Sequence, residues 1–306
     1  MKFINKIPIP IAGLALGSVA LGNLLATYSS LLQLFFSLIS LIIVILLTIK
    51  FSITPKILKS EFTNPLIATV FSTFPMSIIL LSTYFKKYLG YSMSIIWVFG
   101  IALDIFVLCF VVSNFLIKKQ NIKFIFPTWF ITFVGPAVVT VTAISYNLEM
   151  LGKIFFWFSF INYIILIPFV LYRVYVYKKL NVAALPTLTI FSAPGGLLLA
   201  SYMIGITNKS ELIIKILLIL CFIFYMFVLI QLPLLLNRKF YPSYSAFTFP
   251  LVICGMAFQK TYNYYYDTGN NSLILKIGVY FSEVLATIIV IYVLYSFIKH
   301  VFKLEK

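Results

Sequence analysis

Long apolar segments recur along the whole sequence and are separated by short polar ones. Each apolar segment has at least 18 residues, a length that crosses a hydrocarbon layer about 30 Å thick as an α-helix. In chain order, the pattern predicts ten membrane spans: Ile7–Ala26, Leu31–Ile49, Pro65–Phe85, Tyr91–Ile117, Pro127–Tyr146, Leu151–Val176, Pro186–Ile206, Leu212–Leu236, Pro242–Gln259 and Ser272–Ile298. Because the intervening segments are short, we expect one all-α membrane domain over residues 1–306 with no soluble domain attached.

The ten spans are of two alternating kinds. The odd-numbered spans contain ten of the thirteen prolines, eight of the thirteen glycines and no charged residue. The even-numbered spans keep only Pro168 and Pro233, and most of them are longer and more apolar. This alternation indicates that the even-numbered spans face lipid and that the odd-numbered spans have a different role.

A repeat of about sixty residues underlies the alternation. Four odd-numbered spans begin at a proline and carry a second proline eight to ten residues later. These second prolines are Pro75, Pro136, Pro194 and Pro250. The first span has Gly17 at the matching place. We therefore expect five tandem helical hairpins, each made of an interrupted helix followed by a continuous one.

A proline in the middle of a span bends the helix and frees the carbonyl four residues earlier. The freed carbonyls are expected near Phe71, Thr132, Ile190 and Ala246. Such a carbonyl cannot face lipid, so a neighbouring helix, a hydroxyl or water must bond it. Breaks at one depth predict five kinked inner helices around a central pore and five outer helices. The alternative is that these prolines and glycines serve only close helix packing.

The composition agrees with an integral membrane protein. The chain is 62% hydrophobic and 10% charged, and its mean hydropathy is +1.09. The net charge of +16 does not indicate a nucleic-acid partner, because the positive side chains lie only in loops and at span ends.

The positive charges are distributed unevenly between the two sides of the membrane. One side collects 16 of the 23 Lys and Arg residues: Lys2, Lys6, Lys50, Lys56, Lys59, Lys118, Lys119, Lys123, Arg173, Lys178, Lys179, Arg238, Lys239, Lys299, Lys303 and Lys306. This bias predicts that both termini are cytoplasmic. We expect the protein to lie in the inner, cytoplasmic membrane of the cell. Met1–Ala20 resembles a signal peptide, but Pro8 and Pro10 interrupt its apolar part and it fits the repeat, so we interpret it as the first span.

The residue inventory contains no catalytic pattern. Cys109, Cys221 and Cys254 all lie inside spans at no metal-ligand spacing, and the one histidine, His300, lies at the end of the last span. No paired acids or nucleophile motif occurs among the spans. We expect neither an enzyme nor a bound metal or cofactor.

Two acidic residues lie near the middle of even-numbered spans, Asp104 in the fourth and Glu283 in the tenth. An ionised carboxylate there costs at least about 2.5 kcal/mol, so a transport role is a natural hypothesis. Both positions are on outer helices, and a hydrogen bond between helices is the competing interpretation. A proton-coupled transporter would need one of these two acids.

Five motifs follow one another in the odd-numbered spans: "PIAGLALGSVALGN" (Pro10–Asn23), "NPLIATVFSTFPMS" (Asn64–Ser77), "FPTWFITFVGP" (Phe126–Pro136), "LPTLTIFSAPGGLLLASY" (Leu185–Tyr202) and "PSYSAFTFPL" (Pro242–Leu251). In these motifs and their order the chain resembles the tellurite-resistance/dicarboxylate transporter family, which includes bacterial tellurite-resistance protein A, fungal malate uptake proteins and the slow anion channel of plant guard cells. The resemblance implies a homotrimer in which each subunit has its own pore.

The resemblance also implies that a phenylalanine on the ninth helix plugs the pore. The matching residue is Phe249 in "AFTFP", and the repeat makes Phe74 in "STFP" a second candidate constriction. Gly135 and Ala193 occupy the same place in the fifth and seventh spans and leave room opposite the rings. The remaining candidates at the kinks and in the pore lining are Gly17, Pro75, Pro136, Pro194, Thr248 and Pro250.

The expected substrate is a small anion. The odd-numbered spans hold neither acids nor bases, so an anion would meet hydroxyls, backbone groups and a positive field from the cytoplasmic loops, which favours the weak binding of a channel. Two alternatives stay open: a secondary, proton-coupled transporter of four-carbon dicarboxylates such as malate, and a tellurite-resistance exporter.

Overall fold

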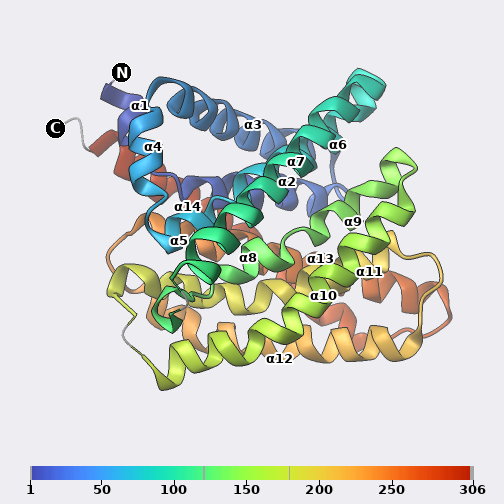
Figure 1. Ribbon diagram of the computed structural model, residues 1–306. Helices are drawn as coiled ribbons and strands as arrows, with labels where there is room; N and C mark the ends of the chain where they lie inside the picture. The colour runs from blue at the N-terminus through green and yellow to red at the C-terminus, as the bar shows by residue number, and fades with distance from the viewer. Residues whose placement is uncertain (1, 120, 179, 304–306) are drawn as a thin grey trace.

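The computed structural model describes residues 2–119, 121–178 and 180–303, and within these ranges every regular element is a helix (Figure 1). Seven stretches of the described chain are long and apolar enough to cross a membrane: Ser30–Ile53, Pro65–Ile117, Trp129–Tyr146, Glu149–Val176, Val182–Gly205, Glu211–Leu236 and Leu273–Phe302. A shorter apolar helix covers Ile11–Leu25. The chain is therefore an all-helical, multi-pass membrane protein. Two of the lysines used in the charge count, Lys179 and Lys306, lie outside the described residues.

The helices have the following bounds. The first part of the chain forms α1 (Lys2–Lys6), α2 (Ile11–Leu25), α3 (Ser30–Ile53), α4 (Pro55–Glu61), α5 (Pro65–Val70), α6 (Thr73–Leu89), η1 (Gly90–Ser92), α7 (Met93–Val111), η2 (Val112–Ile117) and η3 (Ile122–Phe124). The rest forms α8 (Trp129–Val134), α9 (Ala137–Ala143), η4 (Ile144–Tyr146), α10 (Glu149–Leu171), η5 (Tyr172–Val176), η6 (Val182–Phe191), α11 (Ser192–Gly205), α12 (Glu211–Leu236), η7 (Pro242–Phe247), α13 (Thr248–Asp267) and α14 (Leu273–Lys303).

The α-helix is interrupted at each of the four repeated prolines. α5 ends two residues before α6, whose third residue is Pro75, and α8 gives way to α9 at Gly135 and Pro136. η6 and η7 are 3₁₀ helices that turn into α-helices just before Pro194 and Pro250. A 3₁₀ helix bonds each N–H to the carbonyl three residues earlier, so the tighter turn replaces the bonds that a proline removes.

The first span differs from this pattern, because α2 runs through Gly17 without a break. The prediction of a kink at Gly17 is therefore wrong. Gly17 allows close approach instead: a Cβ atom there would overlap the side chain of Thr248 and lie 3.0 Å from the backbone nitrogen of Phe249. Without a side chain at this position, α2 packs directly against the start of α13.

Burial separates the two kinds of span. In the most apolar part of Trp129–Tyr146 and of Val182–Gly205, 78% and 83% of the residues are buried, and all but one of the residues of α2 are buried. For Ser30–Ile53, Glu149–Val176 and Glu211–Leu236, the shares are 33%, 28% and 28%. The exposed side chains of these outer helices are mostly large and apolar, as expected for a surface that contacts lipid.

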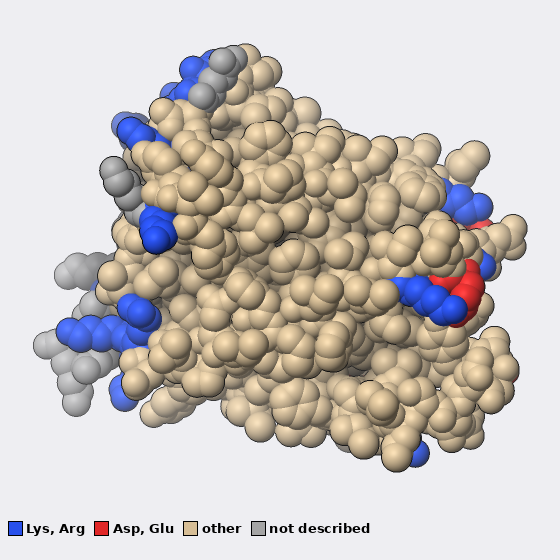
Figure 2. Space-filling view, turned by 90° about the horizontal axis from the view of Figure 1, so that it is seen from below, with Lys and Arg blue, Asp and Glu red and all other residues tan. Residues whose placement is uncertain are grey.

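Charged side chains gather at the two ends of the molecule and leave a wide uncharged band between them (Figure 2). Both chain termini lie at the same end (Figure 1). This arrangement matches a protein whose middle is inside a bilayer and whose ends are in water.

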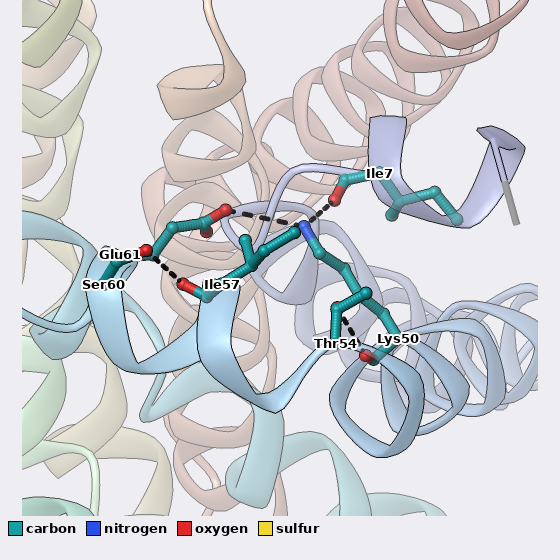
Figure 3. Close-up of polar contacts among 6 residues, drawn as sticks. All are labelled: Ile7, Lys50, Thr54, Ile57, Ser60 and Glu61. Carbon is teal, nitrogen blue, oxygen red and sulfur yellow. Dashed lines mark hydrogen bonds and ion pairs between the residues drawn. The ribbon is translucent and has the colours of Figure 1, made fainter.

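One lysine at the end of the molecule that holds both chain termini is buried inside the fold. Lys50, at the end of α3, is 3% exposed, and its ammonium group donates to the carbonyl of Ile7 at 2.6 Å and lies 3.7 Å from a carboxylate oxygen of Glu61 (Figure 3). These contacts connect the start of the chain to α3 and α4. Lys50 is therefore a structural link, and its charge is largely matched by Glu61.

Candidate functional site

Two cavities lie along the buried segments of the protein. The wide cavity has a volume of about 330 Å³ and lies toward the carboxyl-terminal ends of α2, α6 and α13. The narrow cavity has a volume of about 40 Å³ and lies toward the amino-terminal ends of the same helices. Except for Gln33 of α3, and for Lys87 and Lys260 just beyond the ends of two spans, the residues that line the two cavities come from the odd-numbered spans.

Phe249 belongs to the walls of both cavities. It lies one residue before Pro250, at the point where η7 changes into α13, and it is 7% exposed. Leu197 of α11 is the only other residue that contributes to both walls among the residues that line them. The aromatic ring and the leucine side chain therefore lie where the two cavities meet.

The narrow cavity brings together five of the residues expected at the pore. Gly135, Ala193, Pro194, Phe249 and Pro250 all line it. The other lining residues are mostly apolar, and the hydroxyl-bearing ones are Thr73, Thr187, Ser243 and Ser245. Gly135 and Ala193 have no side chain beyond Cβ, and the sulfur of Met76, which also lines the cavity, would lie 2.8 Å from a Cβ atom at Gly135.

Phe74 lies in a different environment from Phe249. Its ring stacks on Phe71 with centroids 5.4 Å apart and meets Phe51 of α3 edge-on at 5.3 Å. It lines neither the wide nor the narrow cavity, whereas its neighbours Thr73 and Met76 line the narrow one. The repeat therefore places two phenylalanines at equivalent sequence positions, and the fold turns their rings toward different neighbours.

Four other candidates also lie outside the two cavity walls. Gly17, Pro75, Pro136 and Thr248 shape or join helices instead of lining the cavities. Thr248 is completely buried, and its hydroxyl donates to the carbonyl of Gly13 at 2.9 Å. It also lies 2.7 Å from the carbonyl of Ser245 in η7, so this hydroxyl joins α2 to the junction of η7 and α13.

Hydroxyl groups connect equivalent positions of neighbouring repeats. The hydroxyls of Thr69 and Thr128 are 2.6 Å apart, and Ser72 donates to the Thr132 hydroxyl at 3.0 Å. Thr132 in turn donates to the carbonyl of Thr69 at 3.2 Å. These four hydroxyls are therefore used between helices, and none of them lines either cavity.

One expected freed carbonyl has the type of partner that the sequence predicted. The carbonyl of Ala246, four residues before Pro250, accepts a hydrogen bond of 2.7 Å from the hydroxyl of Thr189 in η6. An unpaired carbonyl in a membrane interior is costly. Thr189 therefore stabilises the backbone break beside Phe249.

The wide cavity contains two lysines that the sequence pattern did not reveal. Lys87 and Lys260 both line it, together with Asn23, Gln33 and Tyr84. Both lysines follow an odd-numbered span by one or two residues, and α6 and α13 continue past the predicted span ends to Leu89 and Asp267. The distribution of charges along the sequence predicts a positive field at the opposite end of the protein, so these two lysines add positive charge where none was expected to act on an anion.

The two intramembrane acids line neither cavity. Asp104 on α7 is 2% exposed, and its Oδ1 has no hydrogen-bond partner among the described residues. Glu283 on α14 accepts hydrogen bonds from Gln259 of α13 at 2.6 Å and from the hydroxyl of Tyr28 at 2.7 Å. Burial, with the bond to Glu283, raises the pKa of Tyr28 to about 12, so this hydroxyl keeps its proton at neutral pH.

The chain matches a known protein family over most of its length. The family model SLAC1, described as voltage-dependent anion channel, matches residues 7–300. A search of the curated proteins gives no match. Within the residues that the structure describes, no group of three His, Cys, Asp or Glu side chains could hold a metal ion.

Proposed function

Because the chain belongs to the SLAC1 family of voltage-dependent anion channels, we propose that it conducts small monovalent anions and that Phe249 is the gate. Membership of this family supports an anion channel or transporter in general. We propose that the conducted anion passes from the wide cavity past Phe249 into the narrow cavity.

The observation that carries the proposal is the position of Phe249 in both cavity walls. A side chain shared by two cavities along one route is the natural place for a constriction. A phenyl ring offers an anion no hydrogen bond, so the hydrated anion would have to displace it or lose water to pass. Gly135 and Ala193 contribute only small residues to the wall of the narrow cavity that Phe249 also lines.

We further propose that the chain crosses the membrane ten times. Of the seven long apolar stretches, Pro65–Ile117 would cross twice, because α6 and α7 fold back on each other at η1. The short helix Ile11–Leu25 and residues 242–267 would add the other two crossings. Five inner segments would then surround the route, with five outer helices toward lipid.

The charges along the route favour anions. The wide cavity holds Lys87 and Lys260, and none of the residues that line either cavity is acidic. The narrow cavity holds no charged residue and no arginine fork that could retain a carboxylate. The lysines of the wide cavity would attract an anion, and the narrow cavity would bind it only weakly. Weak binding along the route suits a channel better than a carrier, which needs a tight binding site.

The test compares Phe249→Ala with the parent protein in planar bilayers, with Phe74→Ala as the matched control. We expect the chloride or nitrate current of Phe249→Ala to rise by about tenfold or more, because a ring is removed from the constriction. Phe74→Ala has the same change at the equivalent repeat position and should leave the current unchanged.

Saturable malate exchange without current in both the parent and Phe249→Ala would contradict the channel and support the dicarboxylate transporter. Equal current increases in Phe249→Ala and Phe74→Ala would contradict the assignment of the gate to Phe249. Surface expression and thermal stability of both variants have to be matched before the currents are compared.

Orientation and assembly belong to the same proposal. We propose that both termini are cytoplasmic and that the protein lies in the inner membrane as a homotrimer, as the family resemblance implies. Labelling of single cysteines introduced at exposed Lys56 and Lys215 with an impermeant reagent on intact cells tests the orientation, and only the Lys215 position should react. Native mass spectrometry of the detergent-solubilised protein tests the trimer.

A further inference from the structure

Lys260 is a half-buried cation without a partner in the wide cavity. It makes no hydrogen bond or ion pair with any described residue, and it lines the cavity beside Met256 and Ile253. A partly buried charge is stabilised when an opposite charge or a hydrogen-bond acceptor meets it. The protein supplies neither here, so the position is open to a ligand.

Lys87 lies in the wall of the same cavity and is held in place by its neighbours. Its ammonium group donates to Oε1 of Gln33 at 2.9 Å and lies 4.2 Å from the ring centre of Tyr84. The amide nitrogen of Gln33 donates to Asn23 at 3.0 Å, which fixes the direction of the Gln33 carbonyl. An ammonium group has three N–H donors, and Gln33 accepts only one of them.

The two lysines therefore place two positive charges on the wall of one cavity, and none of the residues that line it is acidic. Two unneutralised cations in a shared, partly enclosed space repel each other, and a single negative charge compensates only one of them. A doubly charged anion compensates both. The cavity volume of about 330 Å³ is large enough for such an anion together with several waters, since one water occupies about 30 Å³ of liquid.

We propose that the wide cavity is a binding site for a divalent anion, held by Lys87 and Lys260, and that this anion blocks the passage of monovalent anions. The inference rests on the proposed conduction route past Phe249. The proposed ligand is a compact divalent oxyanion or dicarboxylate, represented by sulfate and succinate.

The narrow cavity explains why this ligand would block and not pass. Its volume is about 40 Å³, and its walls are apolar apart from a few hydroxyls. A divalent anion holds its hydration shell more strongly than a monovalent one, because the solvation energy rises with the square of the charge. The site attracts the divalent anion, and the constriction beyond it offers too little polar contact to replace the lost water.

The test uses the full-length Phe249→Ala protein in planar bilayers with chloride as the charge carrier. Sodium sulfate or sodium succinate is added to the compartment that faces the wide cavity, and sodium gluconate serves as the large monovalent control. We expect sulfate or succinate to reduce the chloride current in a saturable way, and gluconate to have no such effect. Raising the ionic strength should weaken the block.

Single lysine variants then test the site. In the Phe249→Ala background, Lys87→Gln and Lys260→Gln should each raise the half-blocking concentration by about tenfold or more, the loss expected for one charge-assisted hydrogen bond. Lys215→Gln is the matched control. Lys215 lies at the same end of the protein on α12, is exposed and lines neither cavity.

The outcomes separate the inference from the function on which it rests. If Phe249→Ala carries no anion current, the proposed channel fails. If it carries chloride but sulfate and succinate do not block it, or if gluconate blocks equally, the divalent site is overturned while the channel stands. Equal half-blocking concentrations in Lys87→Gln, Lys260→Gln and Lys215→Gln would also overturn the divalent site while the channel stands.

A binding measurement is independent of conduction. Calorimetric titration of the purified parent protein with sodium sulfate should show binding that Lys87→Gln and Lys260→Gln weaken and Lys215→Gln does not. Unchanged titrations in all variants would overturn the site.

Discussion

The hydroxyl of Thr248 donates a hydrogen bond of 2.9 Å to the carbonyl of Gly13 and so joins the start of α13 to α2. These two helices come from opposite ends of the sequence, 235 residues apart at this bond. The bond lies next to Phe249, and Gly17 faces the same threonine one helical turn further along α2. The backbone position of the proposed gate therefore depends on how closely the first and ninth spans approach.

The close approach at Gly17 gives the first prediction. Gly17→Ala should destabilise the protein by about 1–3 kcal/mol, because the new methyl group overlaps the Thr248 side chain and the backbone of Phe249. Gly278→Ala is the matched control, since no atom lies within 4 Å of a Cβ built at Gly278 in α14. A thermal unfolding series in detergent checks both, and a lower midpoint for Gly17→Ala alone is the expected result.

The matching change at Gly278 should leave the midpoint unchanged or raise it slightly, since alanine favours a helix by about 1 kcal/mol over glycine. Equal midpoints for the parent, Gly17→Ala and Gly278→Ala would mean that α2 and α13 are not in close contact in the protein.

The bond between Thr189 and Ala246 gives the second prediction. Thr189→Val keeps the shape of the side chain but leaves the carbonyl of Ala246 without its donor, so we expect a loss of about 1–3 kcal/mol. Thr187→Val removes a hydroxyl that bonds only the carbonyl of Ala184 in its own helix, and its effect should be smaller. Thermal unfolding midpoints of the two variants show which change destabilises the protein more. A larger loss of stability in Thr187→Val than in Thr189→Val would contradict the prediction.

The buried ammonium of Lys50 gives the third prediction. Lys50→Met removes the donor to the Ile7 carbonyl and leaves Glu61 without its ion pair, so stability should fall by about 1–3 kcal/mol. Adding Glu61→Gln to Lys50→Met should restore part of this loss, because the unpaired carboxylate disappears. Lys56→Gln, an exposed lysine of α4, should have little effect.

A double variant that is no more stable than Lys50→Met would show that Glu61 contributes little and that the bond to Ile7 carries the effect. Unchanged stability of Lys50→Met itself would contradict a structural role for this lysine.

The two intramembrane acids give the fourth prediction. Asp104→Asn and Glu283→Gln should conduct anions like their background in Phe249→Ala, because neither acid lines a cavity. The reversal potential of the current should also stay at the anion equilibrium potential when a pH gradient is imposed. A shift of the reversal potential with pH that either variant abolishes would support proton coupling and contradict a simple channel.

Much of the architecture was visible in the sequence. The membrane class, the all-helical fold and the family all follow from apolar length, proline spacing and ordered motifs, which are local properties of the chain. The helix interruptions at Pro75, Pro136, Pro194 and Pro250 were also predictable, because proline lacks an N–H wherever it occurs.

The candidate site was predictable only in part. The repeat makes Phe74 and Phe249 equivalent, yet one ring packs among aromatic side chains and the other separates two cavities. Lys87 and Lys260 were counted as loop charges, because sequence patterns do not show how far a helix continues beyond the apolar region. Gly17 was expected at a bend, but it provides a contact with a helix more than two hundred residues away.

The sequence by itself determined that this chain is a helical membrane protein with broken and continuous spans, because hydropathy and backbone chemistry act within one helix. Only the tertiary structure decided which side chains line the two cavities, which hydroxyls join neighbouring helices and which lysines share one cavity wall. Those properties depend on how helices rotate and pack against each other, and their packing is set by contacts between residues that are far apart in the chain.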